Sequence, residues 1–379
     1  MRVPAFALVL GGCSFSASTP GSATIDAASD SAPPIIDSAP LDGKVPVVCE
    51  GAYVNFCVDP PQADITLPAT INTTNSPLCA AYKSQPSSSD ACVITGHSIM
   101  LPVGATTSVV GNRQLVLFAT ESITIAGVLD AAGHGQTSGP AGEVGPCGVG
   151  AKNPTRGIQG GGGWGGSFGT AGNNGGNGVS GTGGMAAPAI TVTTLRGGCP
   201  GSNGADNGIG SGGGSRGGGG GAVLLIAQQS ITISGVINAS GGGGGHGTLG
   251  GGGGGGGAGG MIVLDAVDTV TLDGKCFANG GGGGGGANLN SGRDGSESRA
   301  PDQVGSGGSG GVSTGGAGGA GAFGTTGSVP GDNGLRGNKQ TGEDGAGGAG
   351  GGGAGVIRVY AMNQTGTTDA TKLAPPVSN

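Results

Sequence analysis

The strongest pattern in the chain is a set of segments in which apolar and polar residues alternate with a period of two. The most complete copy runs from Gly221 to Gly241, with the sequence GAVLLIAQQSITISGVINASG. Further copies run from Leu115 to Gly133, from Ile262 to Gly280 and, for the first strand only, from Gly355 to Ala361. Such alternation is typical of strands with one buried face. Each full copy therefore predicts three short strands.

Alignment of the copies predicts which side chains face the core, because successive strand residues point to opposite sides. Charged Asp130 and Lys275 and the threonines Thr124, Thr232 and Thr271 fall on the outer face. The predicted inward columns are Leu115/Val223/Ile262/Ile357, Leu117/Leu225/Leu264/Val359, Ala119/Ala227/Ala266/Ala361, Ile123/Ile231/Val270, Ile125/Ile233/Leu272, Leu129/Ile237/Cys276 and Ala131/Ala239/Ala278. One copy cannot bury its own apolar face, so the copies must stack. The pattern predicts an all-β fold, a short right-handed parallel β-helix with no significant α-helix, over residues 111–366.

Composition adds a second element to this fold. The chain has 379 residues with 97 glycines and 21 prolines, together about 31%, a level at which disorder is expected unless the sequence is periodic. The glycines are periodic between the predicted repeats. They recur at every third position from Gly157 to Gly184 and again from Gly241 to Gly259. A period of three is typical of an extended helix with three residues per turn, in which glycine lets neighbouring backbones meet.

The glycine runs resemble the packed polyglycine-II helices of snow-flea antifreeze protein and of some phage tail adhesins. We therefore expect polyglycine-II-like insertions at residues 134–220, 241–259 and 281–354, and disordered loops are the alternative because ordering glycine has a large entropy cost. The outer side of the first strand is unusually apolar, with columns Val116/Leu224/Val263 and Phe118/Ile226/Asp265/Tyr360. We expect the glycine segments to cover this strip, sealed by Trp164 and Phe168.

The start of the chain resembles the signal of bacterial lipoproteins. Met1 to Cys13 contains one cation, a short apolar run and the sequence Leu-Gly-Gly-Cys, which is similar to a lipobox. The resemblance implies cleavage before Cys13 and lipidation of its thiol, and an ordinary signal peptide is the alternative. Residues 14–46 are rich in Ser, Ala, Pro and Asp, which predicts a disordered tether. The expected location is the outer membrane or the cell surface.

The next segment, residues 47–110, contains four of the cysteines, and we interpret it as an N-terminal cap. Four of them lie within 44 residues of an exported chain, which favours two disulfides of undetermined connectivity. A zinc site is the alternative, but the spacing contains no C-x₂-C pair. Residues 93–110 are expected to form one strand that covers the first repeat. The disulfide candidates are Cys49, Cys57, Cys79, Cys92, Cys147 and Cys199, with the last two forming a pair and Cys276 left free in the core.

The chemistry that the sequence offers is sparse. With 15 Lys and Arg against 22 Asp and Glu and no basic run, it gives no electrostatic basis for nucleic-acid binding. His97, His134 and His246 stand at unrelated positions without a carboxylate or thiol at ligand spacing, so no metal is expected. The segment 201–209 resembles a calcium nonapeptide only in part. The acidic column Glu121/Gln229/Asp268 loses its charge in the middle copy. We therefore expect no cofactor and no catalytic residue.

The order of these features, together with the segment Leu195 to Gly201 (LRGGCPG), resembles a group of glycine-rich outer-membrane lipoproteins of myxobacteria-like bacteria. Such proteins are often labelled as similar to the mycobacterial PE-PGRS family, because of triplets such as those in Gly315 to Gly321, although this sequence has no PE domain. The group has no assigned activity, so the resemblance implies no site residues. We expect a surface-exposed structural or adhesive lipoprotein that is not an enzyme, with a disordered tail at 367–379. The alternative is a carbohydrate-active β-helix enzyme or glycan-binding module. The expected partners are a membrane, through the lipid anchor, and extracellular polysaccharide or cell-surface components.

Overall fold

The computed structural model describes residues 47–79, 83–84, 91–143, 145–312, 314–328, 331–332, 335, 344–366, 369 and 371–378. Cys13 and the predicted tether lie outside these residues. All regular elements of the described part are strands, so it is all-β and contains no helix that could cross a bilayer. The strands are β1 (Val48–Glu50), β2 (Phe56–Val58), β3 (Ile65–Thr66), β4 (Thr70–Asn72), β5 (Lys83–Ser84), β6 (Cys92–Gly96), β7 (Ile99–Leu101), β8 (Thr106–Val110), β9 (Leu115–Ala119), β10 (Ser122–Ile125), β11 (Val128–Asp130), β12 (Ala222–Ala227), β13 (Ser230–Ile233), β14 (Val236–Asn238), β15 (Met261–Ala266), β16 (Thr269–Leu272), β17 (Lys275–Phe277), β18 (Val356–Tyr360), β19 (Asn363–Gly366) and β20 (Leu373–Ala374).

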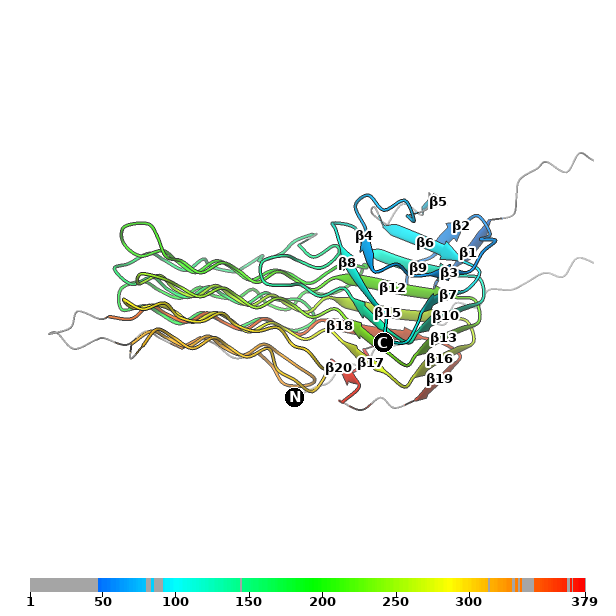
Figure 1. The fold of residues 1–379 in the computed structure, drawn as a ribbon. Helices are drawn as coiled ribbons and strands as arrows, with labels where there is room; N and C mark the ends of the chain where they lie inside the picture. Colours follow the sequence, from blue (N-terminus) through cyan, green and yellow to red (C-terminus); the bar gives the residue numbers. More distant parts are fainter. Residues whose placement is uncertain are drawn as a thin grey trace, which may run out of the picture. The chain divides into compact units, whose positions relative to one another are not determined.

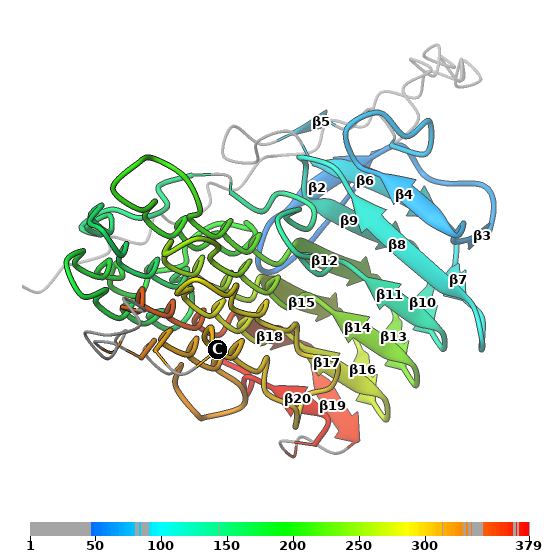
Figure 2. The same ribbon diagram turned by 60° about the vertical axis from the view of Figure 1, so that its left-hand side comes forward.

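Three parallel sheets contain all of these strands except β1, β2 and β5 (Figures 1 and 2). Successive strands of one repeat go to different sheets, so that β12, β13 and β14 each add one strand to one sheet. The sheet orders are β18-β15-β12-β9-β6, β19-β16-β13-β10-β7-β3 and β20-β17-β14-β11-β8-β4. This arrangement of repeats is consistent with a β-helix or another solenoid.

The register confirms the predicted columns. Leu225 pairs with Leu117 on one side and Leu264 on the other, and Ile231 lies between Ile123 and Val270. These side chains are buried together in one continuous apolar core. Stacking copies in register therefore buries the face that each single copy would expose.

The interpretation of residues 93–110 as one covering strand is wrong. β6, β7 and β8 form a further full repeat, and each extends one of the three sheets. Alternation breaks at Val103, whose side chain is 83% exposed, because it lies in a turn before Gly104, which has φ +77°. β3 and β4 add an earlier, partial repeat, so only β1, β2 and β5 of the predicted cap form a separate antiparallel sheet.

The end of the chain also differs from the prediction. The last repeat was expected to have one strand and a disordered tail, but β18, β19 and β20 complete it. Leu373 in β20 is buried against the core, so the described part of 367–379 is ordered. The sequence of β19 lacks the alternation of apolar and polar residues, because polar Gln364 lies opposite Val270 at the exposed end of the stack. No further repeat packs there, so no apolar face is needed.

The outer side of the first-strand sheet is covered, but only partly as expected. Val116, Phe118, Leu224, Ile226 and Val263 form a second apolar cluster. The residues that cover them come from β2, from the segment around Leu195 and from Phe168, so the N-terminal antiparallel sheet shares this role with the glycine-rich insertion. Trp164 does not belong to the cluster, and its expected sealing role is wrong. It faces a polar pocket instead.

Three disulfides are present in the structure. They join Cys49 to Cys57, Cys79 to Cys92 and Cys147 to Cys199. The pairing of Cys147 with Cys199 is the expected one, and it closes a loop of the first glycine-rich insertion. Cys276 is free and fully buried, in the core column where a small apolar side chain was expected. The zinc alternative fails because all four of its cysteines are paired.

The glycine-rich insertions extend from one end of the strands as a layer of straight segments, each termed a rod (Figure 1). Hydrogen bonds between rods step by three residues. Gly163 N–H donates to Gly253 O at 2.8 Å, and three residues on, Gly166 N–H donates to Gly256 O at 2.8 Å. The period of three in the sequence therefore corresponds to one side of a rod that meets one neighbour.

The rod of residues 250–260 lies at the centre of this layer and has six bonded neighbours. Each of its three sides donates N–H groups to one rod and accepts N–H groups from another. It donates to rods 199–205, 239–245 and 347–353 and accepts from rods 160–166, 214–220 and 281–287. A buried backbone needs a partner for every polar group, and this rod finds them without any side chain.

Glycine is required on all sides of such a rod, not only at every third position as expected. A Cβ atom added at Gly255, Gly256 or Gly257 would lie 1.9–2.1 Å from a carbonyl oxygen of three different neighbours. The uninterrupted run Gly250–Gly257 therefore occupies the interior, whereas period-three glycines such as Gly172 and Gly175 occupy rods with an exposed side.

Candidate functional site

The three histidines are the clearest sign of organised polar chemistry, and each faces carboxylates. His97 Nδ1 lies 3.5 Å from Asp64 and its Nε2 lies 3.4 Å from Glu121. His134 lies between Asp130 and Glu297, and His246 Nδ1 lies 2.6 Å from Asp294 Oδ1. The expectation of histidines without nearby carboxylates is wrong.

Sequence spacing missed these pairs because most of them join distant segments. Glu297 is 163 residues from His134, and Asp294 is 48 residues from His246. Both acids lie in the third insertion, residues 281–354. The only local signal is Asp130, four residues before His134.

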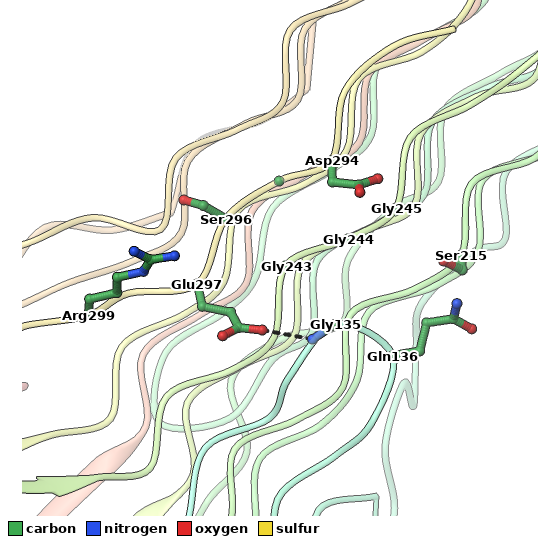
Figure 3. A pocket seen from close by; sticks show the side chains of 11 residues that line it. Gly135, Gln136, Ser215, Gly243, Gly244, Gly245, Asp294, Ser296, Glu297 and Arg299 are labelled. Atoms are coloured by element: carbon green, nitrogen blue, oxygen red, sulfur yellow. Dashed lines mark hydrogen bonds between the residues drawn. The ribbon is translucent and has the colours of Figure 1, made fainter. Parts of the chain in front are cut away.

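Two of these pairs flank a cleft of about 440 Å³ on the side of the glycine layer (Figure 3). One wall is the turn at Gly135 and Gln136, the floor is the rod 243–245, and the other wall is the segment 294–299. Gly135, Gln136, Ser215, Gly243, Gly244, Gly245, Asp294, Gly295, Ser296, Glu297 and Arg299 line the cleft. The polar side chains of this cleft stand on backbone that is itself hydrogen-bonded to neighbouring rods.

His134 binds both regions of the molecule. Its Nε2 lies 3.1 Å from Asp130 Oδ2 at the end of β11, and its Nδ1 lies 2.9 Å from Glu297 Oε2. The hydrogen bonds to Asp130 and Glu297 raise the pKa of His134 to about 10, although burial opposes this. Burial alone would raise the pKa of Glu297, but bonds from His134 and Gly135 N–H lower it below its usual value.

With its pKa raised, His134 is an imidazolium at neutral pH, and it lies beside the cleft between the carboxyl groups of Asp130 and Glu297. A general base needs a free imidazole or carboxylate with a pKa near the working pH, and a protonated histidine with both nitrogens engaged cannot accept a proton. The geometry of Asp130, His134 and Glu297 is that of a clamp between β11 and the third insertion. Gln136 and Arg299 remain for a ligand at the rim, whereas Asp294 is bound by His246.

A second pocket, of about 480 Å³, lies where the N-terminal sheet meets the first-strand sheet. Asp265 lines it and is 6% exposed. Burial raises the pKa of Asp265, while N–H groups of Tyr53 and Ala52 bind its Oδ2 and nearby Glu50 adds repulsion. Tyr360 completes this wall, stacked on Tyr53 with ring centroids 6.0 Å apart.

Two further possibilities for ion binding find no support in the described residues. No group of three or more His, Cys, Asp or Glu side chains there is arranged to hold a metal ion. In the calcium-like segment 201–209, the Asp206 carboxylate binds Arg156 at 3.0 Å, and Asn207 Oδ1 accepts N–H groups of the following turn. These oxygens serve the turn itself.

Comparisons of the chain with protein-family models, with curated proteins and with solved structures found no match.

Proposed function

We propose that the protein is a surface-exposed structural or adhesive lipoprotein, built as a right-handed parallel β-helix with polyglycine-II-like rods, and that it is not an enzyme. In this proposal Cys13 carries the lipid anchor, and residues 14–46 tether the strands and the rods to the outer membrane. The partners are cell-surface components or extracellular polysaccharide.

The observation that carries the proposal is the central rod, whose backbone is hydrogen-bonded on all sides by six neighbours. Such a layer is stabilised by main-chain groups, so side chains are free only at its edges and turns. A rigid platform that presents turns suits a role in structure or attachment. The clamp at His134 strengthens the platform and removes one histidine from acid–base chemistry.

Lipidation and adhesion are tested separately. In a diderm bacterial host, the chain should incorporate labelled palmitate, and Cys13→Ser should abolish the label. Beads coated with the Cys13→Ser protein should adhere to bacterial cells above uncoated beads. An unlabelled wild-type chain contradicts the lipid anchor, and beads that do not adhere contradict the adhesive role.

A glycan-binding or carbohydrate-active function is the second candidate, and the Asp265 pocket favours it. A carboxyl group with a raised pKa beside a second acid, Glu50, is the combination that glycoside hydrolysis uses. Glycan-array binding and turnover of pectin-like and alginate-like polymers test it, with Asp265→Asn as the matched variant. Turnover that the variant abolishes would replace the adhesive proposal with an enzymatic one.

A further inference from the structure

The ends of the rods that point away from the strands carry an unusual set of side chains. Five turns there each present one exposed aliphatic residue, and a sixth lies beside the last turn. They are Ile158, Ile209, Leu249, Leu289, Val312 and Leu335, with exposures of 61–88%. Among the described residues, nine large apolar side chains are more than 60% exposed, and six of the nine are in this group. We term these six residues the distal row.

The distal row is continuous because neighbouring turns bind one another through backbone groups and the side chains of two asparagines. Asn207 Nδ2 donates to Leu249 O at 2.7 Å, and Gly250 N–H donates to Asn288 O at 2.9 Å. The remaining links are Gly250 packed against Ile158 O, Asn288 Nδ2 bound to Val312 O, and Leu335 N–H bound to Thr314 O at 2.8 Å. In Figure 1 these turns form the left-hand end of the layer.

The opposite ends of the rods differ in chemistry. Turns beside the strands carry His134, Gln136, Arg299 and Asp302, and His134 binds the carboxyl groups of Asp130 and Glu297. The distal turns at 157–159, 207–212, 247–251, 287–292 and 311–315 contain only Gly, Ala, Asn, Gln, Ser, Thr and one aliphatic residue each. Charges border them: the ion pair of Arg156 with Asp206 precedes the first two turns, and Leu335 stands between Asp332 and Arg336 in the sequence. One aliphatic per turn on an otherwise small and polar surface is not required by packing, since these side chains are in solvent.

We propose that the distal row docks onto the apolar interior of a lipid bilayer, with each aliphatic side chain inserting between acyl chains. Protein interfaces concentrate their energy in a buried core of Trp, Tyr and Arg, and Leu and Val are under-represented there. The distal row has none of those three residue types and offers no such core. A fluid acyl layer needs no shape complementarity, and insertion of apolar side chains to the headgroup boundary suffices to bind it.

The absence of charge in these turns decides which bilayer they fit. Peripheral proteins that rely on Lys and Arg need anionic lipid, and salt weakens their binding. Insertion of uncharged aliphatic side chains should occur on zwitterionic bilayers and be insensitive to salt. The inference rests on the proposed adhesive role, and it names the membrane of a neighbouring cell as the surface to which the protein attaches.

Vesicle flotation tests this docking. The parent is the full chain with Cys13→Ser, so that no N-terminal acyl group contributes. The distal variant adds Ile209→Ser, Leu249→Ser and Leu289→Ser, and the matched control adds Val103→Ser, Val149→Ser and Met362→Ser, which are equally exposed but lie elsewhere. With phosphatidylcholine vesicles we expect the parent and the control to float equally and the distal variant to bind at least tenfold more weakly. Salt should not change this result.

Several outcomes would overturn the docking. If the parent does not float, the docking is rejected whatever the variants do. If all three proteins bind equally, the affinity belongs to another part of the chain. Binding only in the presence of phosphatidylglycerol indicates charge instead of insertion. A parent that is dimeric by light scattering, does not float and becomes monomeric in the distal variant assigns the row to a second copy. Beads that adhere to cells without flotation leave the adhesive role intact and reject only the lipid partner.

Discussion

The stacked strands and the glycine layer stabilise themselves in opposite ways. In the strands, side chains such as Leu117, Leu225 and Leu264 fill the space between sheets, and burial of apolar surface stabilises the fold. In the layer, rods approach so closely that a Cβ atom added at most of the interior glycines would overlap a neighbouring backbone, and backbone hydrogen bonds link the neighbours. The strands depend on the apolar side chains that fill their core, and the glycine layer depends on the lack of side chains at its glycines.

Because of this difference, the strands and the rods contribute differently to the fold. The repeats set the register, because each strand must match its neighbours in the apolar columns. The rods inherit that register, since rods 214–220 and 250–260 lead directly into β12 and β15. Ordering so many glycines has a high entropy cost, and attachment to an already ordered stack reduces the freedom that each rod must lose.

The largest expected effect comes from removing atoms in the strands. Leu225→Ala leaves a cavity in the core and should lower the free energy of unfolding by about 2–5 kcal/mol. Leu249→Ala in the distal row is the matched control, because its side chain is 62% exposed, and it should change stability by about 0.5 kcal/mol or less. Denaturant unfolding of both variants measures this. Similar losses for both would show that the distal row is packed against another part of the chain.

The layer should show the inverse sensitivity, in which adding one methyl group is harmful. A Cβ at Gly256 would lie 2.1 Å from Gly281 O, so Gly256→Ala must push two rods apart and should cost about 1–3 kcal/mol or more. At Gly327 no atom lies within 4 Å of the added Cβ. Gly327→Ala should be neutral or stabilise by about 0.4–1 kcal/mol, because it restricts the unfolded chain.

Substitutions at the edge of the layer test whether the outer rods are packed as well. Gly172→Val should cost about 1–3 kcal/mol, because its Cβ would lie 2.1 Å from Gly165 O. Thr170→Val loses the bond from Ala354 N–H to the Thr170 hydroxyl, at 2.8 Å, and should cost about 1 kcal/mol. Thermal melts of these variants and of Gly256→Ala rank the positions by the stability that each substitution costs. Equal stability across the set would contradict a packed layer.

The strands could be predicted because apolar alternation records which side of each residue is buried. The alternation within Val223 to Ala227 predicts which side chains of this strand point inward. Comparison with Ile262 to Ala266 predicts which strand stacks on it. The same logic failed at β19, because Gln364 is exposed at the end of the stack and no burial requires an apolar residue there. It also failed at Val103, where a turn interrupts the alternation.

The layer was predictable in kind but not in arrangement. Period-three glycines identify a rod with at least one packed side, but in the continuous run Gly250–Gly257 the period does not show that all sides are packed. Nothing in such a run states which rods are its neighbours. The pairing of His134 with Glu297 depends on that arrangement, so no spacing in the sequence could reveal the clamp or the cleft beside it.

The smallest expected effect concerns the clamp that joins the two regions. The folded pKa of His134, about 10, lies above its ordinary value of 6.5, so its pairing stabilises fully below about pH 6.5 and is lost as pH rises through about 10. The lowered pKa of Glu297 acts in the opposite sense, since its contribution is present above its ordinary value of 4.5 and is lost as pH falls. The clamp should therefore contribute most between about pH 4.5 and 6.5.

His134→Gln should lower the free energy of unfolding by about 1 kcal/mol in that window, a modest figure because the His134 side chain is 52% exposed and solvent screens the pair. His97→Gln is the matched control, and its longer distances of 3.5 and 3.4 Å to Asp64 and Glu121 predict a smaller change. Unfolding measured from pH 4 to pH 10.5 should show the deficit of His134→Gln shrinking toward high pH. A deficit that stays constant with pH would mean that the imidazole acts by packing alone and that charge does not couple the strands to the glycine layer.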